Sequence, residues 1–95
     1  MIILHVTYQV KEGCLDALLA AMEETQVGVL SRQEPGNRTY RYFRPLDAED
    51  QVFLVEEWES QEALDAHKET AHYRKWMEAK KALVASTEIQ EYRTR

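Results

Sequence analysis

Apolar residues alternate with other residues in two segments of the chain, residues 2–10 (IILHVTYQV) and 52–58 (VFLVEEW). A period of two predicts β-strands, and the β-branched and aromatic residues in both segments fit a pleated, buried surface. Both faces of each segment are partly apolar, so we expect both sides of these strands to be covered. Residues 38–44 predict a third strand, and residues 86–93 predict a weaker fourth strand at a sheet edge.

Apolar residues recur at helical spacing between these strands. One helix is predicted from about residue 14 to residue 31, and the stop signal at residues 34–37 (EPGN) follows it. Ser60 is expected to cap a short helix, and Thr70 is expected to cap a second helix that leads toward the last strand. The sequence therefore predicts helices between the first and second strands and between the third and fourth strands.

The order of predicted elements is β-α-β-β-α-β, the split βαβ arrangement of ferredoxin-like α+β folds. Right-handed crossovers put both helical segments on one face of a four-stranded antiparallel sheet. No residues remain to cover the other face, and a homodimer that packs sheet against sheet is the simplest solution. The chain contains no linker, repeat or low-complexity segment, so residues 1–95 are expected to form a single domain.

Composition narrows the class of protein further. Hydrophobic residues make up 44% and charged residues 31% of the chain, a balance that argues against disorder. The formal net charge of −5 argues against nucleic-acid binding, which depends on clustered Lys and Arg. No apolar run has the length of a membrane span and no signal-type segment is evident, so we expect a cytoplasmic protein. Cys14, the single cysteine, cannot form an internal disulfide and is interpreted as a packing residue at a helix start.

The end of the strand at residues 52–58 and the helices after it carry the one group of residues that suggests chemistry. Glu56 shares a strand face with Trp58, and Glu57 points to the opposite face. Because an unpaired buried carboxylate is costly, one of these two carboxylates either faces solvent or has a partner. His67 and His72 follow closely and are the candidate partners.

Each of these residues has a catalytic interpretation and a structural alternative. His72 is expected in the first turn of the last helix, where the helix dipole keeps the ring neutral, and we predict it as the catalytic base. Glu56 would orient this base, and His67 would be a second donor. The alternatives are a capping or surface role for His72, a hydrogen-bonded core role for His67, and an ion pair between Glu56 and an arginine of residues 38–44.

Other residues are candidates for contacts with a substrate or a partner subunit. Trp58 is predicted to offer a flat surface to a planar substrate, with simple core packing as the alternative. Asn37, Tyr40 and Tyr73 are candidate substrate-binding residues, with turn geometry as the alternative for Asn37 and packing for the tyrosines. His5 faces away from the main apolar stripe and is expected to meet the dimer partner.

The spacing of His67 and His72 is not a metal-binding signature. Five residues on one helix would splay the two rings by roughly 140°. Thr70 is also expected to interrupt the helix between them. We therefore predict no metal ligands at these two histidines.

The chain resembles the antibiotic biosynthesis monooxygenase family along nearly its whole length. The resemblance rests on the turn at residues 11–13 (KEG), the break at residues 34–37 (EPGN), and the run at residues 53–64 (FLVEEWESQEAL) followed by His67, Thr70 and His72. It implies a dimeric α/β-barrel with a pocket between the sheet and the helices of each subunit. It also implies oxidation of electron-rich aromatic substrates without metal or flavin.

Three positions depart from branches of this family. Some of its cofactor-free oxygenases carry an asparagine four residues before the tryptophan of the third strand, where this chain has Leu54. The haem-degrading branch uses an asparagine on the first strand and a histidine in the later helix. Val6 and Met77 stand at the corresponding positions, so haem degradation is disfavoured.

The resemblance favours a cofactor-independent monooxygenase acting on a quinol, polyphenol or similar electron-rich small molecule. A base would remove a phenolic or enolic proton, and the resulting anion would react with dioxygen. One alternative is an isomerase of a small phosphorylated hydroxy-dione, which moves a proton without oxygen. Another is a non-catalytic barrel that binds a small molecule, which predicts that Glu56 and the histidines do not converge on one cavity.

Overall fold

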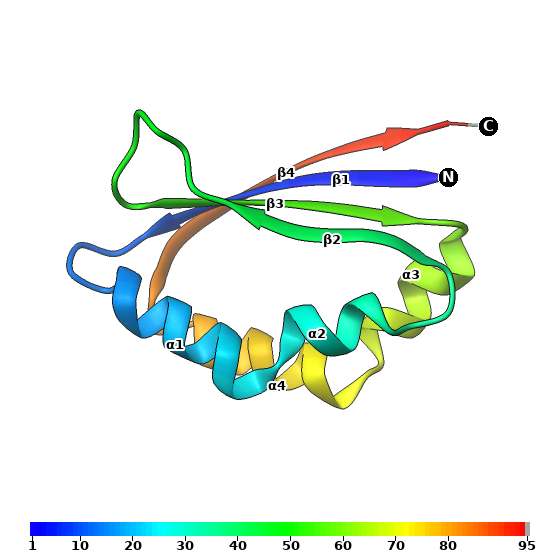
Figure 1. Cartoon of the computed structure of the whole chain (residues 1–95), viewed down its shortest axis with the longest axis horizontal. Helices are drawn as coiled ribbons and strands as arrows, with labels where there is room; N and C mark the ends of the chain where they lie inside the picture. The colour runs from blue at the N-terminus through cyan, green and yellow to red at the C-terminus, as the bar shows by residue number, and fades with distance from the viewer. Residues whose placement is uncertain (95) are drawn as a thin grey trace.

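The computed structural model describes residues 1–94 and contains four strands and four helices in the order β-α-α-β-β-α-α-β (Figure 1). Their bounds are β1 Ile2–Val10, α1 Leu15–Thr25, α2 Val27–Arg32, β2 Asn37–Phe43, β3 Gln51–Trp58, α3 Gln61–Lys68, α4 Ala71–Lys80 and β4 Val84–Arg93. The strands form one antiparallel sheet in the order β2-β3-β1-β4. The predicted ferredoxin-like α+β fold and the edge position of the last strand are confirmed.

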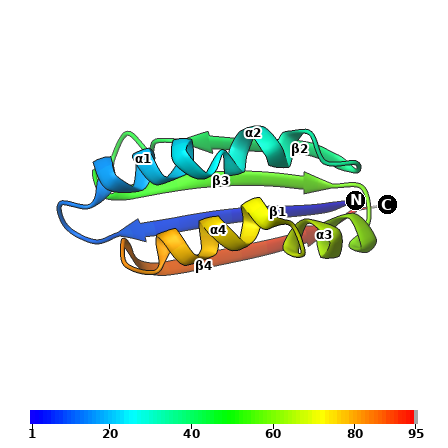
Figure 2. The ribbon, with the colours of Figure 1, turned by 90° about the horizontal axis from the view of Figure 1, so that it is seen from below.

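All four helices cover one face of this sheet, as right-handed crossovers require (Figure 1). Viewed from the helix side, α1 and α2 run along the β2–β3 half of the sheet, and α3 and α4 run along the β1–β4 half (Figure 2). Helix α1 packs against α4, so the α1–α2 pair and the α3–α4 pair meet over the middle of the sheet. Among residues 1–94, no helix covers the opposite face of the sheet.

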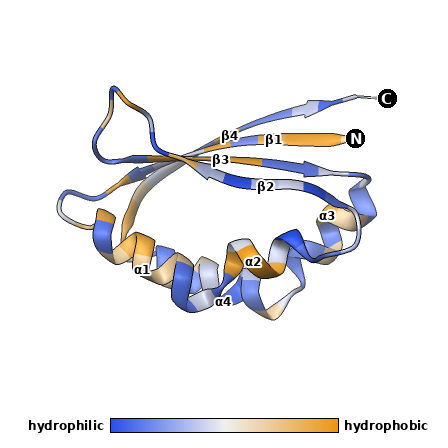
Figure 3. Cartoon of the chain, viewed as in Figure 1, coloured by the Kyte–Doolittle hydropathy of each residue, from blue (hydrophilic) through white to orange (hydrophobic). Residues whose placement is uncertain are grey.

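The period-two pattern of the central strands matches their burial. Every second residue of β1, from Ile2 to Val10, is buried, and so is every second residue of β3, from Val52 to Trp58. These residues face the helices, and all of them except Glu56 form the hydrophobic core together with Leu18, Val27, Tyr40, Leu64 and Trp76. Figure 3 shows strongly hydrophobic residues on β1, the middle of β3, α1 and α2, whereas β2 and β4 are more hydrophilic.

The single helix predicted for residues 14–31 is wrong in one respect, because the chain forms two helices there. Gln26 adopts a left-handed conformation with φ of 56°, which ends α1 and redirects the chain into α2. Thr25 supports this break, since its hydroxyl donates to the Ala21 carbonyl oxygen and accepts from the Val27 N–H. Glycine and asparagine usually occupy such positions, so a glutamine gave no signal of the break.

The predicted helix caps are confirmed. The Ser60 hydroxyl accepts a hydrogen bond from the Ala63 N–H at the start of α3, and the Thr70 hydroxyl accepts one from the Tyr73 N–H at the start of α4. Cys14 lies directly before α1 and packs against the core, as predicted. Within residues 1–94, no helix has the length and apolar character needed to cross a membrane.

Candidate active site

A cavity of about 220 Å³ lies between the helix face of β1 and β4 and the helices α3 and α4. Its aromatic lining consists of Tyr8, Tyr40, Tyr73 and Trp76, and its polar lining includes Glu56, His67, Lys68 and Lys80. The sheet register brings three of the lining residues together, because Tyr40 of β2 and Leu4 of β1 lie on either side of Glu56 of β3. The cavity thus combines flat apolar surfaces with a few ionisable groups.

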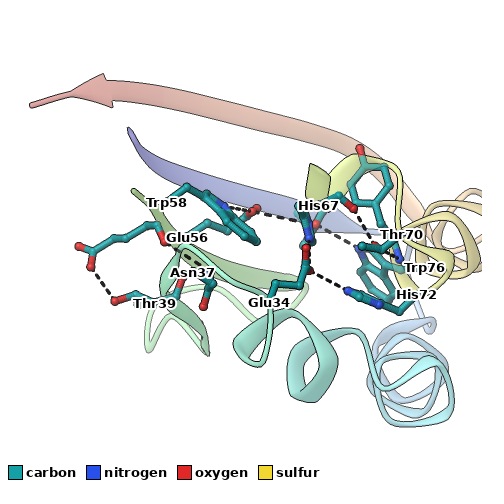
Figure 4. Close-up of polar contacts among 12 residues, drawn as sticks. Glu34, Asn37, Thr39, Glu56, Trp58, His67, Thr70, His72 and Trp76 are labelled. Carbon is teal, nitrogen blue, oxygen red and sulfur yellow. Dashed lines mark hydrogen bonds and ion pairs between the residues drawn. The ribbon is translucent and has the colours of Figure 1, made fainter. Parts of the chain in front are cut away.

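His67 occupies the centre of the polar groups (Figure 4). It lies in the last turn of α3 and is 2% exposed. Its Nδ1 is 2.7 Å from the Glu34 Oε2, and its Nε2 is 4.0 Å from the Glu56 Oε1. Since a carboxylate oxygen is an acceptor, the Glu34 contact places the ring proton on Nδ1 and leaves a lone pair on Nε2.

Glu34 is a site residue that the sequence did not reveal, because residues 34–37 were interpreted only as a turn. Gly36 holds this loop in place with φ of +84°, and a Cβ on Gly36 would lie 2.6 Å from the Ala63 Cβ of α3. A side chain at residue 36 would therefore push the loop away from α3. The close approach lets the Glu34 carboxylate reach both histidines.

His72 is the second residue of α4, as predicted, and its Nε2 is 2.8 Å from the same Glu34 Oε2. One carboxylate oxygen thus accepts hydrogen bonds from two imidazole rings (Figure 4). The splay expected for two histidines on one helix does not apply, because Thr70 separates α3 from α4, as predicted. His72 is partly exposed and is not among the residues that line the cavity.

Glu56 is the buried acidic group of the cavity. Burial raises the pKa of Glu56 from its ordinary value of 4.5 to about 7, although a hydrogen bond from Trp58 opposes this rise. The Trp58 Nε1–H donates to the Glu56 Oε1 at 3.1 Å. The alternative of an ion pair with a β2 arginine is wrong for the described residues, where the titratable side chain near Glu56 is His67, with its Nε2 4.0 Å from the Glu56 Oε1. Glu56 therefore exchanges a proton near neutral pH.

Burial lowers the pKa of His67, while the hydrogen bond and the charge of Glu34 act in the opposite direction. The pKa of Lys80 is also lowered by burial, and its Nζ lies 5.0 Å from the centre of the Tyr8 ring. A neutral imidazole, a carboxyl group that titrates near pH 7 and a partly buried ammonium thus share one small cavity. This set can remove a proton from a bound molecule and stabilise the resulting anion.

The other predicted site residues lie in different surroundings. Tyr40 and Tyr73 line the cavity. Trp58 is fully buried beneath Glu56 and does not line the cavity, although its ring centre is 4.6 Å from that of His67. Asn37 is also outside the cavity, and its amide donates to the carbonyl oxygens of Thr39 and Glu57.

The fold and the cavity define a small ferredoxin-like protein with an aromatic pocket between its sheet and its helices. Comparison with known proteins identifies the family of this protein. A family model for antibiotic biosynthesis monooxygenases matches residues 1–79, so the chain belongs to the antibiotic biosynthesis monooxygenase family. A relative from Bacillus subtilis (strain 168), described as "Putative monooxygenase YcnE", is 29% identical over 86 residues. That match covers 90% of this chain and 88% of the relative.

Solved structures agree with this assignment. "Putative antibiotic biosynthesis monooxygenase from Nitrosomonas europaea" superposes with a TM-score of 0.90 at 26% identity and covers 99% of this chain and 98% of that chain. A structure from Deinococcus radiodurans with the same kind of description superposes with a TM-score of 0.87 at 22% identity, covering 100% of this chain and 93% of that chain. The second similarity concerns the fold alone.

Proposed function

We propose that this protein is a cofactor-independent monooxygenase that oxidises a quinol, polyphenol or similar electron-rich small molecule. The observation that carries the proposal is the position of His67, whose Nδ1 is held by Glu34 and whose Nε2 is directed toward Glu56 beside an aromatic cavity. The family relationship and the name of the Bacillus subtilis relative support oxygenase chemistry. The cytoplasmic location stays a prediction from the sequence.

His67 serves as the base in this proposal. Its Nε2 accepts the proton of a phenolic O–H, and the Glu34 carboxylate stabilises the imidazolium that forms. His67 is preferred over His72 as the base because His67 lines the cavity and His72 does not. His72 then acts as a positioning residue, since its hydrogen bond to Glu34 fixes the carboxylate that orients His67.

The phenolate is the species that reacts with dioxygen. One electron passes from the phenolate to dioxygen, and the substrate radical and superoxide combine to form a carbon–oxygen bond at a ring C–H carbon. The imidazolium of His67 returns its proton to the resulting peroxide. Loss of the C–H proton with cleavage of the O–O bond leaves a carbonyl group and one water molecule, so the substrate supplies all electrons. Apolar walls exclude water and strengthen the interaction between the cavity cations and the anion.

Glu56 and the lysines complete the proposed machinery. Below pH 7 the Glu56 carboxyl is largely protonated and can donate to the peroxide or to a second substrate oxygen. Lys68 and Lys80 line the same cavity and favour an anionic ligand over a neutral one. The tyrosine and tryptophan rings favour a planar ligand.

Two other functions make different predictions. An isomerase would use the same base without consuming dioxygen, and a binding protein would not change its ligand. The convergence of Glu56 and His67 on one cavity supports an enzyme over a binding protein.

An oxygen electrode tests the proposal with a panel of quinols and polyphenols. We expect consumption of one dioxygen and formation of one oxygenated product per substrate molecule. A matched pair of variants, His67→Gln in the cavity and Glu49→Gln in the exposed loop before β3, separates catalysis from general effects of substitution. Absence of oxygen uptake with every substrate, or equal uptake by the His67→Gln variant, would refute the proposal.

We also propose that the active form is a homodimer, which is typical of this family. The sheet face opposite the helices carries Phe43 and Tyr92, which are 42% and 46% exposed. His5 lies on the same face and contacts Phe53 and Tyr92 edge to face. Light scattering should give the mass of two chains, and a monomer at micromolar concentration would contradict the proposal.

A further inference from the structure

We propose that Glu34, His67 and His72 form a binding site for one divalent cation of the zinc class. We further propose that the bound cation switches off the base, and this second part rests on the proposed function. The binding site itself does not depend on any catalytic role. Nothing in the pattern of the sequence pointed to this site, because Glu34 lies far from the histidines along the chain.

The geometry of the three side chains supports the site. The ligand atoms, one from each residue, all lie within 4.8 Å of one another. They come from the loop before β2, from α3 and from α4, so the backbone fixes them from three directions (Figure 4). A tetrahedral site with metal–ligand bonds of about 2.0–2.1 Å separates its ligand atoms by roughly 3.4 Å. The Glu34 oxygen, now 2.7 and 2.8 Å from the two nitrogens, would need only a small side-chain movement.

The chemistry of the donors selects the kind of cation. Two imidazole nitrogens and one carboxylate oxygen suit zinc, cobalt and nickel, whereas magnesium and calcium prefer oxygen donors alone. In the described part of the chain, the ion pairs of Glu34 involve only the two histidines, so no lysine or arginine neutralises it. Three protein ligands leave a fourth position for water.

The surroundings of His67 fit a metal ligand as well. A histidine that binds a metal through one nitrogen commonly directs its other nitrogen toward a carboxylate. The Nε2 of His67 lies 4.0 Å from the Glu56 Oε1. His72 and Glu34 are 13% and 11% exposed at their side chains, which leaves a route for a cation from solvent.

Cation binding has a direct consequence for the proposed base. A cation on Nδ1 displaces the ring proton of His67, and the neutral ring then carries its proton on Nε2. The ring can donate to a ligand in this state but cannot accept a proton from it. A bound cation is therefore expected to inhibit proton abstraction by His67 without changing the shape of the cavity.

Titration of the metal-free protein with Co²⁺ and Zn²⁺ tests the site without a substrate. We expect one Co²⁺ per chain with the visible absorption of a tetrahedral complex, displaced by Zn²⁺. His72→Ala and His72→Gln should each weaken binding by at least about 100-fold, because loss of a direct ligand exceeds the roughly 10- to 100-fold effect of losing a residue that only hydrogen-bonds to a ligand, whereas the control His5→Gln should bind like the wild type. Circular dichroism confirms that each variant is folded. No saturable binding, or equal loss in His5→Gln, would overturn the site.

Oxygen uptake then tests the switch. Zn²⁺ should abolish uptake by the wild type, and a chelator should restore it. Binding without inhibition would overturn the switch and leave the site standing. If the metal-free protein consumes no oxygen with any substrate, the proposed function fails, while the titration still decides whether the site exists.

Discussion

Replacing Glu34 separates two contributions of this carboxylate, the hydrogen bonds to the histidines and the negative charge beside them. Glu34→Ala leaves the Nδ1–H of His67, which is 2% exposed, without its carboxylate acceptor. A hydrogen bond to a charged group contributes about 1.5–3 kcal/mol, and His72 loses a second, more exposed one. We therefore expect Glu34→Ala to lower the free energy of unfolding by roughly 2–4 kcal/mol in urea titrations.

Glu34→Gln keeps an amide oxygen where the carboxylate oxygen accepts both hydrogen bonds. We expect a stability loss of about 1 kcal/mol, because a charge-assisted hydrogen bond is roughly twice as strong as a neutral one. The imidazolium formed during proton abstraction loses a similar amount of stabilisation, so kcat for oxygen uptake should fall about fivefold. Glu49→Gln, in the exposed loop before β3, is the control. A folded Glu34→Gln variant with wild-type kcat would refute the role assigned to Glu34.

Three further predictions concern Glu56, Trp58 and Ser60. Because folding raises the pKa of Glu56 to about 7, the folded state binds the extra proton between about pH 4.5 and pH 7, and stability falls as the pH rises through this range. Urea titrations should show that Glu56→Gln removes roughly 3 kcal/mol of this pH dependence, and an unchanged profile would contradict the burial argument. Trp58→Phe deletes the hydrogen bond that opposes the shift, so the pKa of Glu56 measured by carboxyl NMR should rise further, and a fall would be inconsistent with the Trp58 contact. Ser60→Ala should cost about 1 kcal/mol of stability by removing the α3 cap, whereas the exposed control Ser86→Ala should cost little, and equal effects would contradict the cap.

Local patterns of the sequence predicted most of the fold. The period of two identified β1 and β3 because their alternate residues are buried against helices, and the hydroxyl residues Ser60 and Thr70 marked the starts of α3 and α4. The break at Gln26 escaped prediction because glutamine has no intrinsic preference for a left-handed conformation.

The candidate site was less accessible to sequence reasoning. Glu56 and His67 were selected because an acidic residue in a buried strand and a histidine on an inner helix face are unusual. Glu34 was overlooked because a carboxylate next to a Pro-Gly turn usually faces solvent, and only the close approach of the loop to α3 brings it to the histidines. The direction of each histidine ring also depends on this tertiary contact, so the sequence alone did not indicate which histidine faces the cavity.

Anaerobic binding of a phenolic ligand tests the central claim most directly, because it isolates proton abstraction from the reaction with dioxygen. The wild-type protein is mixed under argon with a quinol or naphthol at a pH where the free phenol stays protonated. Absorption of the phenolate should appear on binding to the wild type and should be absent with His67→Gln. A ligand that binds the wild type and stays protonated, or that ionises equally in the His67→Gln variant, would contradict the assignment of His67 as the base.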